Sequence, residues 1–271
     1  MAAKIPIFSM EKKKLSERSL PVQFSEAYRP DLIRRAVVAL QSAARQKYGT
    51  FPEAGQRHSA ETSKRRHDYR GTYGQGISRV KRKILSRRGS RMGWVGALTP
   101  QTRGGRRAHP PRAEKNFEKK LNKKENRKAI RSAMAATLNN ALVAHRGHHI
   151  PAEYPFILDK SLEQLKTTKE VQAVLSALGF GEELQRSLLK KIRAGIGKLR
   201  GRRYKKKKGL LLVVGDEASS LCKAARNIPG IDVVPVRAVN AELLAPGTMP
   251  GRVTLWTEKA LDVLEKEKLF I

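Results

Sequence analysis

The sequence predicts an α/β fold whose mostly parallel sheet carries helices on both faces, interrupted by a long non-globular basic loop. The first observation is that apolar runs of strand length alternate with segments of helical period after residue 150, which is typical of parallel sheets. The second is that residues 49–113 are rich in Lys, Arg and Gly and show neither a helical nor a strand period. We therefore expect a globular α/β part of residues 1–48 and 114–271 and an extended loop of residues 49–113.

Two amphipathic helices are predicted, one on either side of the loop. Pro30 and Asp31 favour a first helical turn, and the apolar residues after them return at helical spacing as far as Ala44. After the loop, apolar residues from Ile130 to Leu142 predict one long second helix. Because a structureless connection of about 65 residues is far longer than ordinary loops, we expect it to have a function of its own.

The remainder of the chain predicts strands in alternation with helices. Strands are expected at residues 156–158, 210–214, 233–236 and 253–256. Thr167 and Glu170 have the spacing of a capping box before an apolar helical stripe that ends at Gly179. Two further helices are predicted directly after strands, at residues 218–225 and from Glu258 to about Lys266.

The charge balance of the chain indicates a polyanionic partner. Its 271 residues include 57 Lys or Arg and 24 Asp or Glu, which gives a formal net charge of +33. Such a chain repels itself unless a polyanion is present, so nucleic acid is the predicted partner. A hydrophobic content of 39% is sufficient for a buried core, and this excludes a wholly disordered chain.

The sequence carries no recognisable targeting or membrane segment. No apolar run approaches the roughly 18 residues of a spanning helix, and residues 1–8 lack the apolar core and cleavage site of a signal peptide. The single cysteine, Cys222, excludes an internal disulfide and a multi-cysteine zinc site, which fits a reducing compartment. We expect a cytoplasmic protein without a membrane partner.

The basic loop combines the residue types that recognise RNA. Arginine pairs with phosphates and stacks on bases, glycine lets the backbone approach RNA closely, and the rings of Tyr69, Tyr73 and Trp94 can stack on bases. A solvated disordered tail is the alternative, but this loop is internal and tethered by a helix at each end. A second basic run spans residues 198–208. The candidate RNA-binding residues are Arg57, Lys64, Arg65, Arg66, Arg70, Arg79, Lys81, Arg82, Lys83, Arg87, Arg88, Arg91, Trp94, Arg103, Arg106, Arg107, His109, Arg112, Lys198, Arg200, Arg202 and Arg203.

Motifs for a cofactor, a nucleotide or a metal are incomplete. The glycines of residues 71–76 are in the wrong order for a dinucleotide loop, and residues 195–199 fail as a P-loop because Leu199 stands in the Ser/Thr place. His145, His148 and His149 have no cysteine nearby, and the next carboxylate lies beyond a helix-breaking proline. We therefore expect no cofactor, no metal and no catalytic residue.

An RNA-modifying enzyme with an α/β catalytic domain is the rival function. Parallel α/β sheets often carry active sites at the carboxyl ends of their strands, where Asp216 and Glu258 are predicted to lie. No cofactor loop accompanies these carboxylates. Turnover by the purified protein, or a cofactor pocket beyond Val214, would favour the enzyme.

A series of short segments, in a specific order and spacing, resembles one known family over nearly the whole chain. The segments are residues 29–31, 54–55, 59–61, 89–91, 104–111, 128–133, 167–170, 193–198, 226–231, 244–247, 251–252 and 256–260. Together they resemble the universal large-subunit ribosomal protein four (L-four) family in its archaeal and eukaryotic form. The chain ends at Ile271 without the long basic tail of eukaryotic members, which favours an archaeal source.

The resemblance implies a structural constituent of the large ribosomal subunit that is not an enzyme. Such a protein binds 23S-type rRNA, contacts neighbouring large-subunit proteins and supports early assembly of the subunit. Its loop would form part of the wall of the polypeptide exit tunnel and meet the nascent polypeptide, with the stem near Gln56 and His109. The resemblance places the tunnel tip within residues 71–96, at Arg79, Arg87, Arg88, Gly89, Ser90 and Arg91. Lys81, Arg82 and Lys83 depart from the glycine-rich tip of eukaryotic members.

Overall fold

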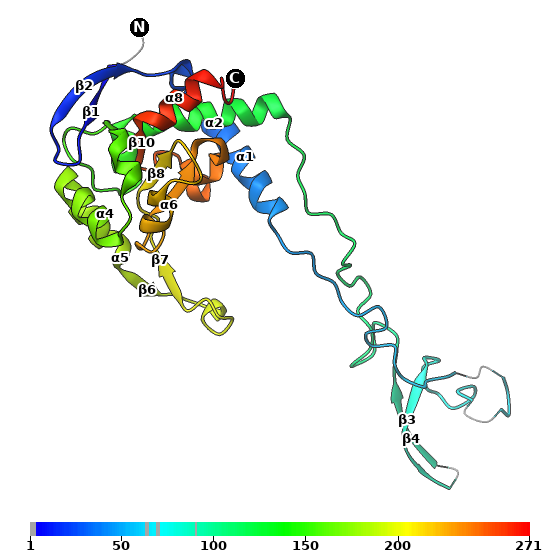
Figure 1. Ribbon diagram of the computed structural model, residues 1–271. Helices are drawn as coiled ribbons and strands as arrows, with labels where there is room; N and C mark the ends of the chain where they lie inside the picture. Colours follow the sequence, from blue (N-terminus) through cyan, green and yellow to red (C-terminus); the bar gives the residue numbers. More distant parts are fainter. Residues whose placement is uncertain (1–3, 63–64, 69–70, 90) are drawn as a thin grey trace. The chain divides into compact units, whose positions relative to one another are not determined.

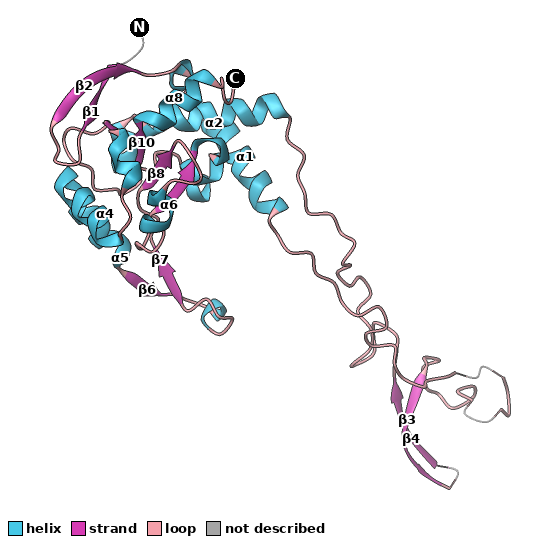
Figure 2. Ribbon diagram, in the orientation of Figure 1, coloured by secondary structure: helices cyan, strands magenta, loops and turns pink. Residues whose placement is uncertain are grey.

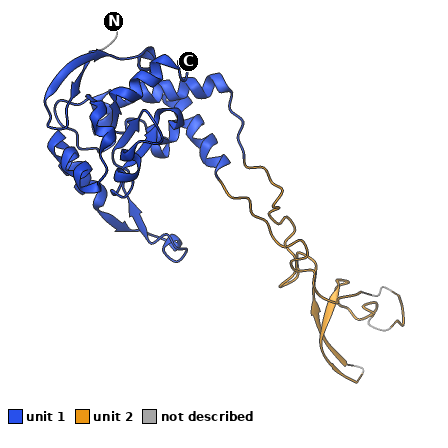
Figure 3. Cartoon of the chain, in the orientation of Figure 1, with its two compact units in different colours: residues 1–44, 118–271 blue, residues 45–117 orange. Residues whose placement is uncertain are grey.

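The computed structural model describes residues 4–62, 65–68, 71–89 and 91–271, which form two compact units (Figure 3). We call residues 4–44 and 118–271 the body and residues 45–117 the insertion. The predicted RNA-binding residues Lys64 and Arg70 and the predicted tip residue Ser90 lie outside the described residues, as does Tyr69. Each unit is described by itself.

The body is built on a six-stranded sheet (Figures 1 and 2). Its order is β2 (Lys14–Ser19), β1 (Lys4–Phe8), β5 (Ile157–Leu158), β10 (Thr254–Thr257), β8 (Leu211–Val214) and β9 (Asp232–Pro235). Only β2 pairs antiparallel, and the four other pairings are parallel. All residues of β8 and β10 are buried. Because successive side chains of a strand point to opposite faces, both faces of the sheet are covered there. The predicted α/β class with a mostly parallel sheet is confirmed.

The N-terminal strand pair was absent from the sequence prediction. In β2 five of the six residues are exposed, so the strand shows no apolar alternation. It is held through its backbone, in register with β1 from Lys4 opposite Ser19 to Phe8 opposite Lys14. The pair covers the β1 edge of the sheet with a charged strand, which discourages pairing with other chains.

The helices that follow the strands agree closely with prediction. α4 (Thr168–Leu175) begins with the predicted capping box, and α8 (Glu258–Lys266) has the predicted bounds. α6 spans Ser220–Ala225. A π-helical turn, Ser176–Phe180, contains Gly179 in the left-handed region at φ 93° and leads into α5 (Gly181–Leu188). The remaining short elements are α7 (Ala241–Leu244) and 3-10 turns at Val22–Ser25, Lys160–Gln164, Ile196–Lys198, Val236–Ala238 and Pro246–Thr248.

The predicted helices before and after the insertion pack on each other, but the second is shorter than expected. α1 (Pro30–Ala43) and α2 (Lys123–Thr137) bury apolar residues such as Ile33 and Ile130. The prediction of one helix through Leu142 is wrong. The Asn139 side chain accepts hydrogen bonds from the N–H groups of Ala141 and Leu142 and so starts a separate helix, α3 (Asn140–His145).

The insertion contains regular structure that the sequence analysis did not predict. β3 (Arg82–Arg88) and β4 (Arg91–Gly96) form an antiparallel hairpin with an irregularity between Ile84 and Ser86. A few small residues of the insertion are buried, among them Ala60 and Ala97. The prediction of a structureless connection is therefore wrong for residues 82–88 and 91–96. Basic side chains on both faces of the hairpin hide the period of two that marks a strand.

Candidate nucleic-acid interface

The tip of the β3–β4 hairpin concentrates exposed guanidinium groups. Arg88 pairs with Arg91 and Arg87 pairs with Met92 across the two strands, and all three arginines are exposed. Like charges directly opposite each other are destabilising in a strand pair. Gly89, at the turn, has φ 57°, a conformation that favours glycine. The tip thus places its cations where they repel each other and face outward, as a surface for a polyanion requires.

One face of this hairpin is less polar and partly covered. Ile84 lies opposite Trp94, and the Arg82 guanidinium lies 5.8 Å from the centre of the Trp94 ring. Arg82 also donates to the backbone oxygen of Ser78 at 2.9 Å. Trp94 was predicted to bind RNA, yet its half-buried ring also packs within the hairpin. Its role in the structure is therefore partly architectural.

Other predicted arginines of the insertion lie over aromatic rings. The Arg57 guanidinium is 4.0 Å from the centre of the Phe51 ring. Arg66 lies 4.9 Å from the centre of the Tyr73 ring and donates to the Tyr73 hydroxyl at 2.7 Å. A cation held against a ring loses conformational freedom before any partner binds, so the guanidinium groups are preoriented.

The two chain segments at the base of the insertion approach each other at glycines. A side chain at Gly49 would collide with the backbone of Ala113, and one at Gly55 would lie 2.6 Å from the Arg106 Cα atom. Beside the first approach, the Thr50 N–H donates to the Pro111 oxygen at 3.0 Å. We call residues 45–57 and 105–117 the stem. Glycine allows its segments to run in contact without a regular ladder of hydrogen bonds.

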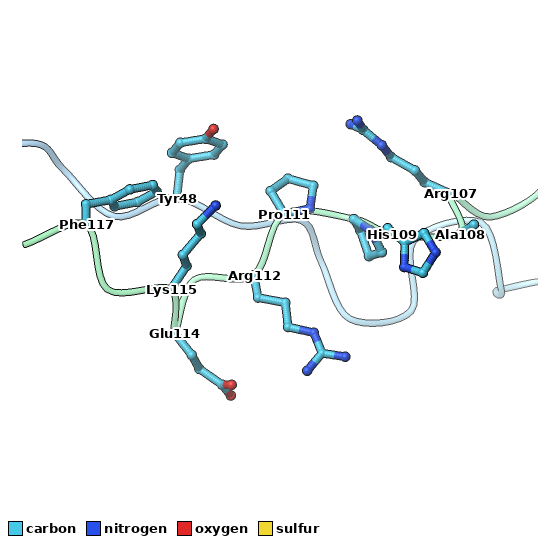
Figure 4. A pocket seen from close by; sticks show the side chains of 10 residues that line it. Tyr48, Arg107, Ala108, His109, Pro111, Arg112, Glu114, Lys115 and Phe117 are labelled. Carbon is cyan, nitrogen blue, oxygen red and sulfur yellow. The ribbon is translucent and has the colours of Figure 1, made fainter.

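The stem bears an open recess of about 740 Å³. Figure 4 shows the side chains that line it. We call it the stem recess; its lining is Tyr48, Arg107, Ala108, His109, Pro110, Pro111, Arg112, Glu114, Lys115 and Phe117. The structure thus brings together three residues that the sequence analysis selected separately, namely Arg107, His109 and Arg112. The recess also contains residues that the analysis missed, because Tyr48 and Phe117 lie beyond the predicted loop. The sequence pattern that could have indicated them is an aromatic residue close to a basic one, which occurs at both ends of the predicted loop.

The second predicted basic run forms a separate hairpin in the body. β6 (Lys190–Ile192) pairs with β7 (Tyr204–Lys206), and the register sets lysine against lysine at two positions. The predicted residues of this run, Lys198, Arg200, Arg202 and Arg203, are all exposed. From Lys190 to Lys208 the chain contains 11 Lys or Arg and no acidic residue. This hairpin is the body's own candidate surface for a polyanion.

A buried charged cluster holds the base of that hairpin. The Arg186 guanidinium donates to Glu183 at 2.5 Å and to the backbone oxygen of Lys208 at 2.8 Å. His148 Nδ1 lies 2.7 Å from the same carboxylate. Burial acts to raise the pKa of Glu183, but the hydrogen bonds from Arg186 and His148 outweigh it and lower the pKa to about 2. Burial lowers the pKa of His148, although the neighbouring Glu183 carboxylate acts to raise it. The place of His148 in this cluster was not predicted, because its spacing in the sequence suggested only a possible metal ligand.

At the carboxyl ends of the parallel strands, where an enzyme would place its catalytic groups, two carboxylates are already paired. Glu163 accepts hydrogen bonds from the Gly215 N–H at 2.8 Å and the Thr257 hydroxyl at 2.6 Å. Asp216 forms an ion pair with Lys259. These carboxylates therefore connect the strand ends to one another and to α8.

The chain is similar along its length to proteins of one family. The family model described as "Ribosomal protein L4/L1 family" matches residues 19–267. "Large ribosomal subunit protein uL4" of Nanoarchaeum equitans is 49% identical over 266 residues, which cover 98% of this chain and 99% of that protein. Proteins of the same name from Archaeoglobus fulgidus and Methanocaldococcus jannaschii are 45% and 43% identical; the matches cover 96% and 97% of this chain and 98% of each relative. Within the described residues, no helix is both long and apolar enough to cross a membrane.

Proposed function

Since the chain belongs to the Ribosomal protein L4/L1 family, we propose that it is a structural constituent of the large ribosomal subunit that binds 23S-type rRNA. The family is structural and non-enzymatic, which excludes an RNA-modifying enzyme. The protein acts in the cytoplasm, bound to the ribosome beside neighbouring large-subunit proteins. There it supports early assembly of the subunit.

The surplus of cations in the insertion carries this proposal. Residues 45–117 include 19 Lys or Arg and four acidic residues. Exposed guanidinium groups at Arg87, Arg88 and Arg91 and preoriented ones at Arg57 and Arg66 fit phosphates, which arginine contacts through its planar fork. Phosphate contacts of this kind supply affinity with little dependence on sequence, as a scaffold for folded rRNA requires.

Binding to 23S-type rRNA transcribed in vitro tests the proposal. Affinity is measured by filter binding between 50 and 200 mM salt. A protein that makes 6–10 phosphate contacts loses roughly 10³- to 10⁵-fold in affinity over this range on duplex DNA, and we expect a similarly steep loss here. An acidic protein of equal size serves as the control for retention on the filter. An affinity that hardly changes with salt would contradict the proposal.

The β3–β4 hairpin is the part of the insertion that we assign to the wall of the polypeptide exit tunnel. A slender two-stranded ribbon with a glycine turn occupies little cross-section, and its cations are compensated where rRNA phosphates surround it. Gly89 and the neighbouring arginines of the tip would then face the nascent polypeptide.

Photo-crosslinking in translating ribosomes tests the tunnel assignment. A photoreactive residue at Ser86, in β3, is expected to form adducts with nascent chains. The same residue at Ser219, next to α6 in the body, is the matched control and is expected to form none. Adducts from Ser219 without adducts from Ser86 would show that the tunnel assignment is wrong.

A further inference from the structure

The stem recess presents aromatic rings and cations on one surface. The rings of Tyr48 and Phe117 lie nearly parallel, with an angle of 13° and centres 5.8 Å apart. The Arg45 guanidinium lies 4.4 Å from the centre of the Phe117 ring, and the Lys115 ammonium lies 5.7 Å from the same centre. Figure 4 shows Tyr48, Lys115 and Arg107 extending from one side of the stem, with Arg112 and Glu114 extending from the other.

The Tyr48 ring is available to a partner. The residue is 53% exposed although its ring stacks on Phe117 and has the Arg45 guanidinium 5.6 Å from its centre, so a further flat group can still reach the ring. Rings of this kind bind exposed nucleobases, and neighbouring cations bind the phosphates that join them. A volume of about 740 Å³ falls within the roughly 300–1,000 Å³ of pockets that hold small-molecule ligands.

We propose that the stem recess holds one unpaired nucleotide of ribosomal RNA. Its base stacks on the Tyr48 ring, and its phosphates lie at Lys115 and Arg107. The inference rests on the proposed rRNA binding and adds to it a specific contact. A paired base cannot enter such a recess because both of its faces are covered by the bases above and below it. The recess therefore selects a bulged or looped nucleotide, which sets the position of the stem along the RNA.

Charge favours RNA over protein as the occupant. Lys115 and Arg107 extend from the side of the stem that bears Tyr48, while Glu114, the acidic residue of the lining, extends from the other side (Figure 4). An acidic peptide would satisfy the cations but would leave the face of Tyr48 without a planar partner. A peptide in the recess is consequently a competing outcome that the crosslinking experiment below distinguishes.

Affinity for 23S-type rRNA, measured with the full chain, tests the proposed stacking. Tyr48→Ala is expected to weaken binding roughly 5- to 150-fold, the range for loss of one stacked base. Tyr48→Phe retains the ring and is expected to bind like the parent protein. The slope of affinity against salt should be unchanged in Tyr48→Ala, because no charge is lost, and shallower by about one in Arg107→Gln. Tyr28→Ala, which removes a 43% exposed ring from the body, is the matched control.

Ultraviolet crosslinking locates the contact directly. The complex is irradiated and digested with trypsin and nuclease, and adducts are identified by mass spectrometry. A nucleotide adduct is expected on the peptide of residues 48–57 or that of residues 116–119. Irradiation of native ribosomes that gave peptide adducts on these fragments in place of nucleotide adducts would overturn the proposal.

Failure of the recess and failure of the proposed function have different signatures. If the parent protein does not bind the rRNA with steep salt dependence, the proposed function itself is wrong. If the parent protein binds in this way while Tyr48→Ala binds equally well, the nucleotide recess alone is wrong. Circular dichroism of each variant tests whether the body remains folded. We expect that it does, because Tyr48 lies in the insertion.

Discussion

The body and the insertion use their positive charge in different ways. In the body, basic side chains pair with carboxylates from distant segments: Arg18 lies 2.6 Å from Asp262, and Arg131 lies 2.8 Å from Glu26. Such pairs connect the strands and helices of one fold. The charge of these arginines is therefore largely neutralised within the protein.

In the insertion the described contacts of several arginines are with aromatic rings. The pairs are Arg45 with Phe117, Arg57 with Phe51, Arg66 with Tyr73 and Arg82 with Trp94, at 4.0 to 5.8 Å. A ring orients a guanidinium group without neutralising it, so the charge remains available to a partner. The body is therefore stabilised by its own contacts, while the insertion is arranged for contacts that an external polyanion supplies.

The largest effect is expected from a cation that the body has enclosed completely. Arg252 is fully buried, donates to the backbone oxygens of Gly209 and Leu243, and lies 2.6 Å from Asp232. Arg252→Met leaves those buried oxygens without their donor, while Asp232 keeps its ion pair with Lys208. Because each buried oxygen left unpaired costs about 1–3 kcal/mol, the free energy of unfolding should fall by about 3 kcal/mol or more. Urea unfolding followed by circular dichroism measures this loss.

The control for that change is Arg237→Met, which breaks an exposed ion pair with Glu267. Its unfolding midpoint should stay close to that of the parent protein, because exposed pairs contribute little. If Arg252→Met were as stable as the parent protein, the contacts of the body's charged side chains would not be what stabilises it.

Removal of the insertion is expected to affect binding and leave the body folded. Replacement of residues 45–117 by a flexible Gly-Ser linker deletes 19 basic residues and no strand of the main sheet. The affinity for 23S-type rRNA should fall at least roughly 100-fold at low salt, since many phosphate contacts are lost. The thermal midpoint of the body should change little. A body that unfolded without the insertion would show that the two units are not stabilised independently.

Sequence patterns predicted the body better than the insertion for a physical reason. α8 begins at the predicted Glu258 and ends at Lys266, near where its end was predicted, because its apolar spacing is a local signal. β2 was missed because its exposed residues depend on pairing with β1, which no local pattern encodes. The break between α2 and α3 was missed because the apolar residues keep their helical spacing across it. Asn139 is a residue type that favours the N-cap position and could have indicated the break.

The candidate interface shows the same limit. Its arginines were recognisable from composition alone, since RNA-binding loops are rich in Arg and Gly. The stem recess was not, because Tyr48 and Phe117 are far apart in sequence and become neighbours only where Gly49 lies against Ala113. A recess of this kind depends on the approach of two backbone segments that are distant in sequence, and no local sequence pattern predicts that approach.

Acid should weaken the body through the Glu183 cluster. The folded-state pKa of Glu183 is lowered to about 2 from an ordinary value of 4.5, so its contribution is present above pH 4.5 and is lost as the pH falls toward 2. The lowered pKa of His148 acts in the same direction below its ordinary value of 6.5. At pH 3 the Glu183 contribution should be smaller by about 2 kcal/mol than at pH 7.

Urea unfolding at pH 7 and pH 3 tests this contribution. Glu183→Gln should reduce the difference in stability between the two pH values by about 2 kcal/mol, because the variant has no carboxyl to protonate. Glu182→Gln alters the adjacent, exposed carboxylate and should leave the difference unchanged. An equal pH dependence in the parent protein and in Glu183→Gln would exclude the cluster as a source of acid sensitivity.

The smallest expected effect concerns the β6–β7 hairpin, where the body behaves like the insertion. Lys191 lies opposite Lys205, and Lys190 lies opposite Lys206, so the strands repel each other. An isolated two-stranded ribbon is marginally stable in water. We infer that this hairpin gives up some of its own stability in order to present cations, as the tip of the insertion does at Arg88 and Arg91.

Lys191→Glu separates the stability of this hairpin from its binding. The variant places opposite charges across the strands, which should stabilise the pair by about 0.2–1 kcal/mol. Amide hydrogen exchange should therefore slow a few-fold in β6 and β7. The same change replaces one positive charge by a negative one, so rRNA affinity should fall and its salt dependence should become shallower. Lys266→Glu, at the end of α8, makes the same charge change away from the hairpin and controls for net charge. If Lys191→Glu slowed exchange and bound rRNA as tightly as Lys266→Glu, the hairpin would be a structural element of the body without a share in binding.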